Sequence, residues 1–262
     1  MRAFNERPLG AFPFLIIDAM YCKSRTDYDG VVSKAALMIS ALNAEGNREI
    51  PGVRIGDSES ESFWRETFEW LKDRGIRDVT SVTSDDHRGM VSALRRSFQG
   101  VIWQRCQVHF MRNVLSFTPA RHKAAMAAGL RRIFAGEDGA EARAKAVELA
   151  EQFDNRADRA ISCLEDGLEE ALAVYAMPAK YRRRLKSTNM QERLIQEVRR
   201  RERVIRIFPN EAPVLRLIGA LLAEFHEEGQ GRKYLDMAEY HEWHAQRDAG
   251  EKEENVVVMT EA

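Results

Sequence analysis

LIIDAMY, residues 15–21, is the stretch from which the fold of this 262-residue chain can be inferred. Leu15, Ile16 and Ile17 have the apolar composition of a buried strand, and Asp18 interrupts them. Burying a bare charge is costly, so a carboxylate in this place must be paired, protonated or bound to a metal ion. Two later carboxylates, Asp85 and Glu192, occupy comparably unusual places. We therefore expect these three side chains to share one site.

Strand and helix patterns alternate on the C-terminal side of this stretch. Three strand patterns in meander order favour an antiparallel start, and later strands alternate with helices. The helix SESESFWRETFEWLKDRG can be capped by Ser58 or Ser60, and its aromatic stripe is typical of core. The pattern predicts an α/β fold, in which helices pack on a mixed sheet. The expected strands are residues 14–24, 31–42, 50–55, 78–84 and 101–106.

From Val108 to about Met177 the chain has helical patterns only, and Pro178 closes this region. A further helix holds Glu192 in its first turns, with Ser187, Thr188 or Asn189 as a possible cap. We therefore divide the chain into a lead-in, a core interrupted by an all-helical insertion, and a tail. The irregular lead-in is 1–12, the first part of the core 13–107, the insertion 108–178, the second part with the Glu-bearing helix 179–245, and the polar mobile tail 246–262.

Composition and charge limit the function classes. With 44% hydrophobic and 31% charged residues the chain is typical of a soluble, foldable protein. Its net charge of −1 conceals a segment, residues 180–206, with eleven basic and three acidic residues, net +8. Such a segment indicates a polyanionic partner, or else a solvated helix face. Three widely spaced cysteines argue against a disulfide framework, and no stretch is typical of a membrane span or signal peptide, so we expect a cytoplasmic protein.

The expected carboxylate site suits a hard divalent cation. Mg²⁺ prefers oxygen ligands, usually one or two carboxylates with water and substrate phosphate. Two such ions about 4 Å apart can activate an attacking oxygen and stabilise a leaving one at phosphorus. Aspartates at adjacent strand ends would form the rigid half of the site, and a glutamate on a helix could swing in to complete it. With 41 acidic residues in the chain, spacing alone does not select this triple.

Longer strings make the assignment specific. In collinear order over roughly residues 7 to 240, they closely resemble the bacterial mutator-type insertion-sequence transposases, related to eukaryotic Mutator elements. The strings are LIIDAMYCK, VVSKAALMISALNAEGNREIPG, FWRETFEWLKDRG, VTSDDHRGM, VIWQRCQVHFMRNVL, STNMQERLIQEVRRRERVIRIFPNEA and LIGALLAEFHEE.

The resemblance implies a ribonuclease H-like (retroviral-integrase-like) fold with an Asp-Asp-Glu triad, using Mg²⁺ or Mn²⁺ to cleave and transfer DNA strands. Asp18 matches the first Asp, Asp85 the second and Glu192 the Glu of the string TN-x-x-ER. Asp86 departs from the small residue expected after the second Asp, and it could substitute as a ligand, although we prefer Asp85.

Other matched residues have supporting roles. Cys106 and His109 form Cys-x2-His, which resembles the family pattern. A zinc site needs four ligands, and no second pair has suitable spacing, although Cys22, His87 and His122 are conceivable partners. We expect instead that the pair packs or hydrogen-bonds near the active site. His87 could orient the second Asp, contact a phosphate, or serve only structurally at a helix start. Trp103 is expected in the core.

The partners implied are DNA, at element ends and target, and a second copy of the chain. Candidate DNA contacts are Asn189, Arg193, Arg199, Arg200, Arg201 and Arg203, since basic side chains supply most sequence-independent affinity. The family's N-terminal region that recognises inverted repeats has no room before the first strand, so the chain resembles the catalytic part alone. The alternative is an inactive truncated remnant that binds DNA or full-length transposase without catalysis.

Overall fold

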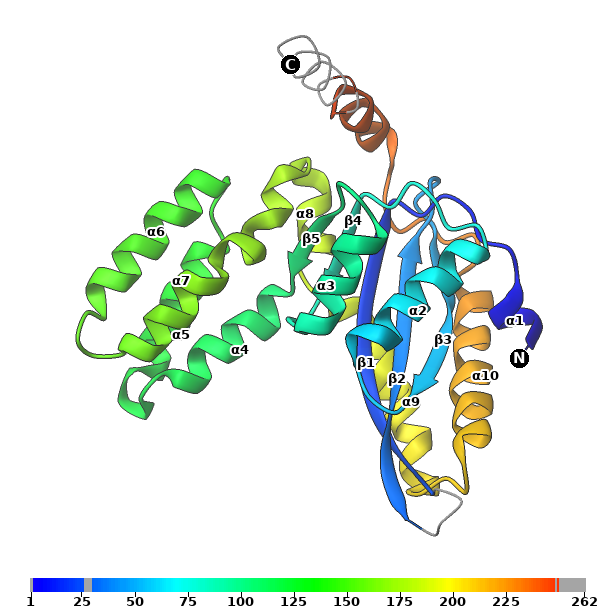
Figure 1. The fold of residues 1–262 in the computed structure, drawn as a ribbon. Coiled ribbons are helices and arrows are strands. Elements are labelled where there is room, and N and C mark those ends of the chain that lie inside the picture. Colours follow the sequence, from blue (N-terminus) through cyan, green and yellow to red (C-terminus); the bar gives the residue numbers. More distant parts are fainter. Residues whose placement is uncertain (1, 26–29, 248, 250–262) are drawn as a thin grey trace, which may run out of the picture.

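A five-stranded mixed sheet forms the centre of the computed structural model, which describes residues 2–25, 30–247 and 249 (Figure 1). The strand order is β3-β2-β1-β4-β5. β1, β2 and β3 pair antiparallel, as the meander pattern predicted, whereas β4 runs parallel to both β1 and β5. The α/β class expected from the sequence is therefore confirmed. The strands are β1 (Phe14–Arg25), β2 (Val31–Leu42), β3 (Arg48–Gly56), β4 (Ser81–Ser84) and β5 (Ile102–Arg105).

The fourth strand is shorter than predicted. β4 begins at Ser81, whereas the sequence pattern favoured a start at Asp78. Asp78 adopts a left-handed conformation with φ of 60°, which an extended strand does not contain. Residues 78–80 therefore form the approach to the strand and leave only four residues in it.

The two faces of the sheet bury different sets of side chains. Leu15 and Ile17 of β1 pack under α2 (Glu61–Asp73) and α3 (Arg88–Ser97). Met20 and Cys22 face the opposite way, toward α9 (Asn189–Ile205) and α10 (Glu211–Gly229). Successive strand residues point to opposite faces, so Asp18 shares the parity of Met20 and lies on the α9 side.

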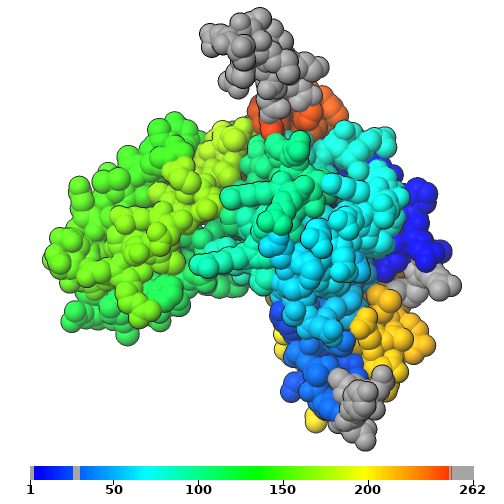
Figure 2. Space-filling model, viewed as in Figure 1, coloured from blue at the N-terminus to red at the C-terminus, as the bar shows by residue number. Residues whose placement is uncertain are grey.

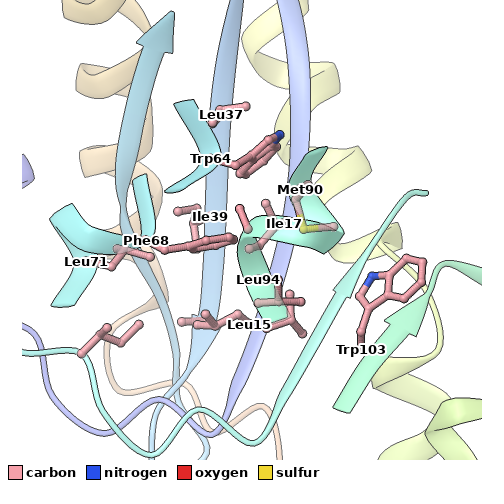
Figure 3. Close-up of a cluster of buried hydrophobic side chains, with 14 of the residues drawn as sticks. Leu15, Ile17, Leu37, Ile39, Trp64, Phe68, Leu71, Met90, Leu94 and Trp103 are labelled. Carbon is pink, nitrogen blue, oxygen red and sulfur yellow. The ribbon is translucent and has the colours of Figure 1, made fainter. Parts of the chain in front are cut away.

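α2 forms the predicted core helix. The Ser60 side chain accepts a hydrogen bond from the backbone N–H of Phe63, and this cap begins the helix. Trp64, Phe68 and Leu71 are buried on one stripe, against Leu94 of α3 (Figure 3). Trp103 of β5 belongs to the same cluster, as the sequence analysis expected.

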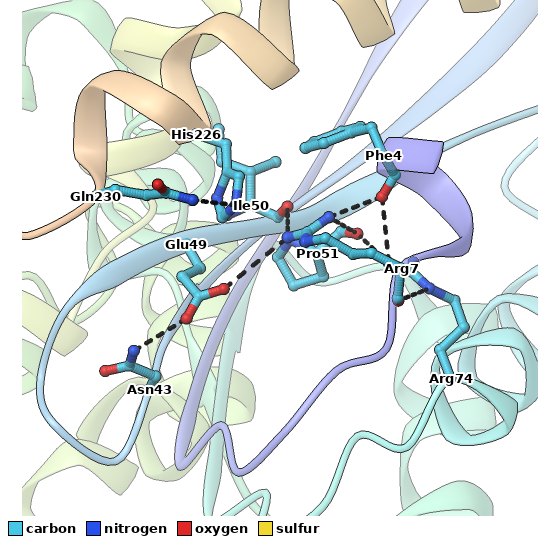
Figure 4. A network of polar contacts seen from close by, with 9 residues as sticks. All are labelled: Phe4, Arg7, Asn43, Glu49, Ile50, Pro51, Arg74, His226 and Gln230. Carbon is cyan, nitrogen blue, oxygen red and sulfur yellow. Dashed lines mark hydrogen bonds and ion pairs between the residues drawn. The ribbon is translucent and has the colours of Figure 1, made fainter. Parts of the chain in front are cut away.

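The lead-in departs from the expected irregular structure, because Arg2–Glu6 form the short helix α1. The Arg7 guanidinium explains its place: it donates hydrogen bonds to the carbonyl oxygens of Phe4, Ile50 and Pro51 (Figure 4). Arg74 donates to the carbonyl oxygens of Arg7 and Pro51. Two guanidinium groups thus tie α1 to the edge strand β3, a tertiary contact that no local pattern indicates.

The helical insertion forms a lobe beside the sheet, with its own apolar core (Figures 1 and 2). Four α-helices and short 3₁₀ turns make up the described part of this region, which begins at Gln107, one residue before the predicted boundary. After it, α8 (Ala179–Leu185) follows Pro178 and leads back to the sheet. The helices are α4 (Gln107–Phe117), α5 (Lys123–Ile133), α6 (Gly139–Gln152) and α7 (Asp158–Leu172).

The C-terminal part of the described chain is helical over residues 238–247, so the helix passes the predicted start of the tail at 246. The Tyr240 hydroxyl is 2.7 Å from the Thr80 hydroxyl, and Arg247 donates to the carbonyl oxygen of Gly100. Residues 248 and 250–262 of the predicted mobile tail lie outside the described residues. Among the described helices, none is both long enough and apolar enough to cross a membrane.

We predict that Leu94→Ala lowers the free energy of unfolding by about 2–5 kcal/mol, because Leu94 is fully buried between α3 and the sheet and its removal leaves a cavity. Urea unfolding followed by circular dichroism measures the change. Val147→Ala on the exposed face of α6 is the control and should change stability by less than about 0.5 kcal/mol. Equal effects of the two substitutions would contradict this core assignment.

Candidate active site

The parallel pairing of β1 with β4 brings two of the predicted carboxylates together. Ile16 of β1 is in register with Thr83 of β4. Asp18 and Asp85 each lie two residues beyond this pair, so they are at the same level, where β4 has ended and β1 continues. Parallel strands therefore align two aspartates that are 67 positions apart in the sequence.

The environment of Asp18 disfavours its ionised form. Burial raises the pKa of this carboxyl from 3.8 to about 6, and the charges of Asp85 and Glu59 act in the same direction. A hydrogen bond from the Ala19 backbone N–H to Asp18 Oδ1, 2.8 Å long, and the charge of His109 oppose the rise only in part. A site that raises a carboxyl pKa in this way would gain from a nearby cation.

His109 of α4 supplies positive charge beside the aspartates. Its Nδ1 is 3.7 Å from Asp85 Oδ2. The interaction with Cys106 raises the pKa of His109 to about 9 against the effect of burial, and the charges of Asp85 and Asp18 add to the rise. The surroundings of the ring therefore favour its charged form, next to Asp85.

Glu192 is held near the aspartates by its neighbour in the sequence. The fully buried Gln191 side chain donates a 2.7 Å hydrogen bond to the carbonyl oxygen of Met38, and its own oxygen accepts from Ser40, 2.5 Å away. Met38 is the partner of Asp18 in the β1–β2 register. The first turn of α9 is therefore fixed on β2, directly across from Asp18.

The Glu192 carboxylate itself is turned toward α4. Its Oε1 lies 3.5 Å from Arg112 Nη2. His109 and Arg112 are three residues apart and share one face of α4, so this helix contacts Asp85 with one side chain and Glu192 with the other. In the described part of the chain, no three His, Cys, Asp or Glu side chains lie close enough together to hold a metal ion. The structure thus brings Asp18 and Asp85 together and leaves Glu192 in an ion pair beside them.

Cys106 connects the two halves of the core. Its backbone N–H donates to the carbonyl oxygen of Ser84 at the end of β4. Its sulfur accepts a hydrogen bond from the Thr188 backbone N–H, 3.4 Å away, and lies 3.5 Å from the Thr188 hydroxyl. Burial acts to raise the pKa of this thiol, but interactions with His109 and Thr188 outweigh it and lower the pKa. Thr188 is the N-cap residue of α9, so Cys106 joins the aspartate edge to the start of the Glu192 helix.

Asp86 and His87, which follow Asp85, have other surroundings. Asp86 Oδ2 forms a 3.0 Å ion pair with the largely buried Arg105, away from His109. This pairing supports Asp85 over Asp86 as the second aspartate. His87 is the N-cap residue of α3; its backbone N–H donates to the carbonyl oxygen of Asp85, and its side chain makes no capping hydrogen bond.

The predicted DNA contacts divide into groups. Asn189 and Arg193 are exposed in the first turns of α9. Arg200 pairs with Glu197 at 3.0 Å, and Arg201 with Glu224 at 3.5 Å. Arg199 and Arg203 line an open depression farther along the helix.

Three residues near the site escaped the sequence analysis: Glu59, Arg112 and Gln191. Gln191 interrupts the apolar stripe of α9 in the way that Asp18 interrupts its strand, and this signal was available. Glu59 and Arg112 act through charge at positions set by tertiary packing, and their surroundings in the sequence do not distinguish them from other surface charges.

Comparison of the sequence with known proteins identifies the family of this chain. A family model described as transposase, Mutator family, matches residues 1–231. The chain belongs to the Mutator family of transposases. This membership confirms the resemblance found in the sequence.

Curated relatives in the Mutator family are insertion-sequence transposases. The transposase for insertion sequence element IS256 in transposon Tn4001 of Staphylococcus aureus is 41% identical over 86% of this chain and 58% of the relative. The transposase for insertion sequence element ISRM5 of Rhizobium meliloti is 38% identical over 92% of this chain and 61% of the relative. The transposase for insertion sequence element IS1081 of Mycobacterium tuberculosis is 36% identical over 90% of this chain and 58% of the relative. The chain thus spans about three fifths of the length of these relatives.

We predict that Asp18→Asn stabilises the fold at neutral pH. The folded state favours protonated Asp18, so the contribution of this side chain to the stability of the wild type is complete below pH 3.8 and is lost as the pH rises through about 6. The unfolding free energy of the variant minus that of wild type should therefore grow between pH 4 and pH 7.5, by up to about 3 kcal/mol. Urea unfolding in metal-free buffer across this range measures the difference.

Asp73→Asn, which removes an exposed carboxylate at the end of α2, is the control for the substitution itself. A difference for Asp18→Asn that stays flat across the range would contradict the assigned pKa.

Proposed function

We propose that this chain is the catalytic core of an Asp-Asp-Glu transposase, which cleaves element ends and transfers the freed 3′-hydroxyl to a target phosphodiester. The observation that carries the proposal is the alignment of Asp18 with Asp85, with the Glu192 turn fixed across from Asp18 through Gln191. Family membership and the insertion-sequence relatives support DNA as the substrate. We also propose a ribonuclease H-like fold; the strand order and the antiparallel-then-parallel pairing support it.

The residues present fit a divalent cation. Asp18 and Asp85 supply oxygen ligands close together, and the pKa of Asp18 is raised first by burial and then by the charges of Asp85 and Glu59, all of which a bound cation would oppose. Asp18, Asp85 and Glu192 would hold Mg²⁺ or Mn²⁺, which when bound supplies charge neutralisation and polarisation at the reacting phosphorus.

The chain's own residues perform the remaining tasks. Glu192 must leave Arg112 to reach the aspartates, a side-chain rotation on a helix that Gln191 keeps in place. Arg112 is then free to pair with a phosphate oxygen, which a guanidinium binds well. The raised pKa of His109 favours a positive charge beside Asp85, which would limit repulsion between the aspartates and the DNA backbone.

The proposal extends to the setting of the reaction. Two element ends must be processed together, so we propose that two chains act as a homodimer on paired ends, in the cytoplasm. The competing proposal is a remnant that binds DNA without catalysis.

We predict that Asp18→Asn, Asp85→Asn and Glu192→Gln each reduce strand cleavage and joining by more than roughly 100-fold, because each removes an anionic oxygen ligand. The assay uses the full chain, Mg²⁺ or Mn²⁺, and a labelled duplex with the terminal sequence of the parent insertion element, pre-nicked at its end. Glu148→Gln is the matched control, since Glu148 is also an exposed glutamate paired with an arginine, at 3.1 Å.

Metal-dependent product that disappears in the three variants and persists in the control supports the proposal. DNA binding by wild type without product would favour the remnant. Product that survives in the three variants would overturn the assigned triad.

A further inference from the structure

An open depression of about 680 Å³ lies between the C-terminal half of α9 and β1 at Tyr21 and Lys23. We propose that this depression, which we call the basic cleft, binds the sugar–phosphate backbone of duplex DNA about half a helical turn from the reacting phosphodiester. This inference rests on the proposed function, because it places the same substrate. The residues that line the basic cleft are Tyr21, Lys23, Arg199, Glu202, Arg203, Arg206 and Ile207.

Charge selects the ligand. The basic cleft has four cationic side chains and a single carboxylate, that of Glu202. Among the described residues, none of the four cations forms an ion pair with a carboxylate within 4.0 Å, whereas the neighbouring Arg200 and Arg201 both do. Unpaired exposed cations grouped on one surface are suited to phosphate. A second copy of the chain would bring these cations against one another.

The basic cleft lies at about the same distance from the carboxylates whether that distance is measured along β1 or along α9. Lys23 lies five residues after Asp18 in β1, which is about 17 Å of extended strand. Arg203 lies eleven residues after Glu192 in α9, which is about 16 Å of helix. Since the N-terminal turn of α9 is fixed across from Asp18 and its later residues pack on Met20 and Cys22, the two elements run side by side from the carboxylates to the cleft.

This path is open to a duplex. β4 pairs with β1 only from Phe14 to Ile16, and Phe208 hydrogen-bonds to β1 only at Lys23 and Arg25. Among the described residues, the edge of β1 between these two points has no strand partner. At about 3.4 Å per base pair, 16 Å corresponds to about five base pairs. A duplex with its reacting phosphodiester at Asp18 and Asp85 would therefore present its fourth to sixth phosphates to the basic cleft.

The backbone at the end of α9 is strained in a way that favours this role. Arg206 has φ of 62°, a conformation in which glycine is the usual residue. Phe208 fixes the turn from outside, since its N–H donates to the Lys23 carbonyl oxygen and its own carbonyl oxygen accepts from the Arg25 N–H. An arginine kept in this conformation, with its side chain at the basic cleft, points to a function for the guanidinium.

The test measures DNA binding by the full chain across 50–300 mM KCl, with chelator present so that cleavage does not contribute. Arg199→Ala and Arg203→Ala should each reduce the slope of log affinity against log salt concentration by about 1, and the double variant by about 2. Arg131→Ala, an exposed arginine of α5 in the helical insertion, is the control and should leave the slope unchanged. Thermal unfolding checks that each variant is folded.

Comparison within α9 makes the test specific. If the whole run of arginines acts as a diffuse charge, Arg200→Ala and Arg201→Ala should lower the slope as much as Arg199→Ala and Arg203→Ala. Equal losses at all four positions would overturn the basic cleft. Larger losses at Arg199 and Arg203 support it.

Location is tested by neutral methylphosphonates in the duplex. Substitution at the fourth to sixth phosphates from the element end should weaken wild-type binding about tenfold and should have little further effect on the Arg199→Ala, Arg203→Ala double variant. Equal weakening of both proteins would overturn the placement. Variants that change self-association and leave the salt slope intact would instead identify the surface as an interface between copies.

These results separate the two proposals. A chain that binds with the expected slope but forms no product overturns the proposed catalysis alone. A chain that forms product while the slope is unchanged in both arginine variants overturns the basic cleft alone.

Discussion

Parallel pairing between β1 and β4 is the constraint on which the rest of the candidate site depends. It extends over three residue pairs, from Phe14 with Ser81 to Ile16 with Thr83, yet it sets Asp18 and Asp85 at the same level. A shift by one residue would send one aspartate to the opposite face. The apolar residues on both faces of β1 fix this register, because they can be buried in only one alignment. Packing of the core therefore holds two like charges close together.

Burial of Asp18 has a cost, which appears in its raised pKa, and the charge of Asp85 adds to that cost. The fold offsets it in part with the Ala19 N–H and with His109 of the helical insertion. The insertion is thus more than a separate lobe. Its first helix, α4, approaches both sides of the site, with His109 beside Asp85 and Arg112 beside Glu192. A helix that contacts both partners can respond when their charges are neutralised, and this is where we expect the site to rearrange when DNA and a cation bind.

α9 combines two roles along one helix. Its first turn is fixed in the sheet through Gln191, and its apolar stripe packs on β1 and β2. Its outer face carries the arginines that the charge count identified. Tertiary contacts then divide these arginines: acidic neighbours on α9 and α10 pair Arg200 and Arg201, whereas Arg199 and Arg203 face the edge of β1. Residues with the same charge in one short run therefore have different surroundings.

The sequence by itself determined the α/β class, the β2 strand to the residue, the core stripe of α2, the helical insertion and the membership of the Mutator family, because periodicity and motif strings are local and the sequence records them directly. Only the tertiary structure decided that Arg7 and Arg74 hold α1 on β3, and that β4 begins after Asp78. It also decided the ion pair of Glu192 with Arg112. Finally, it decided that Asp85 rather than Asp86 lies beside His109. These features join residues that are distant in sequence or depend on a single backbone angle. Their energies come from strand register and from the burial of charge, which exist only once the sheet has formed.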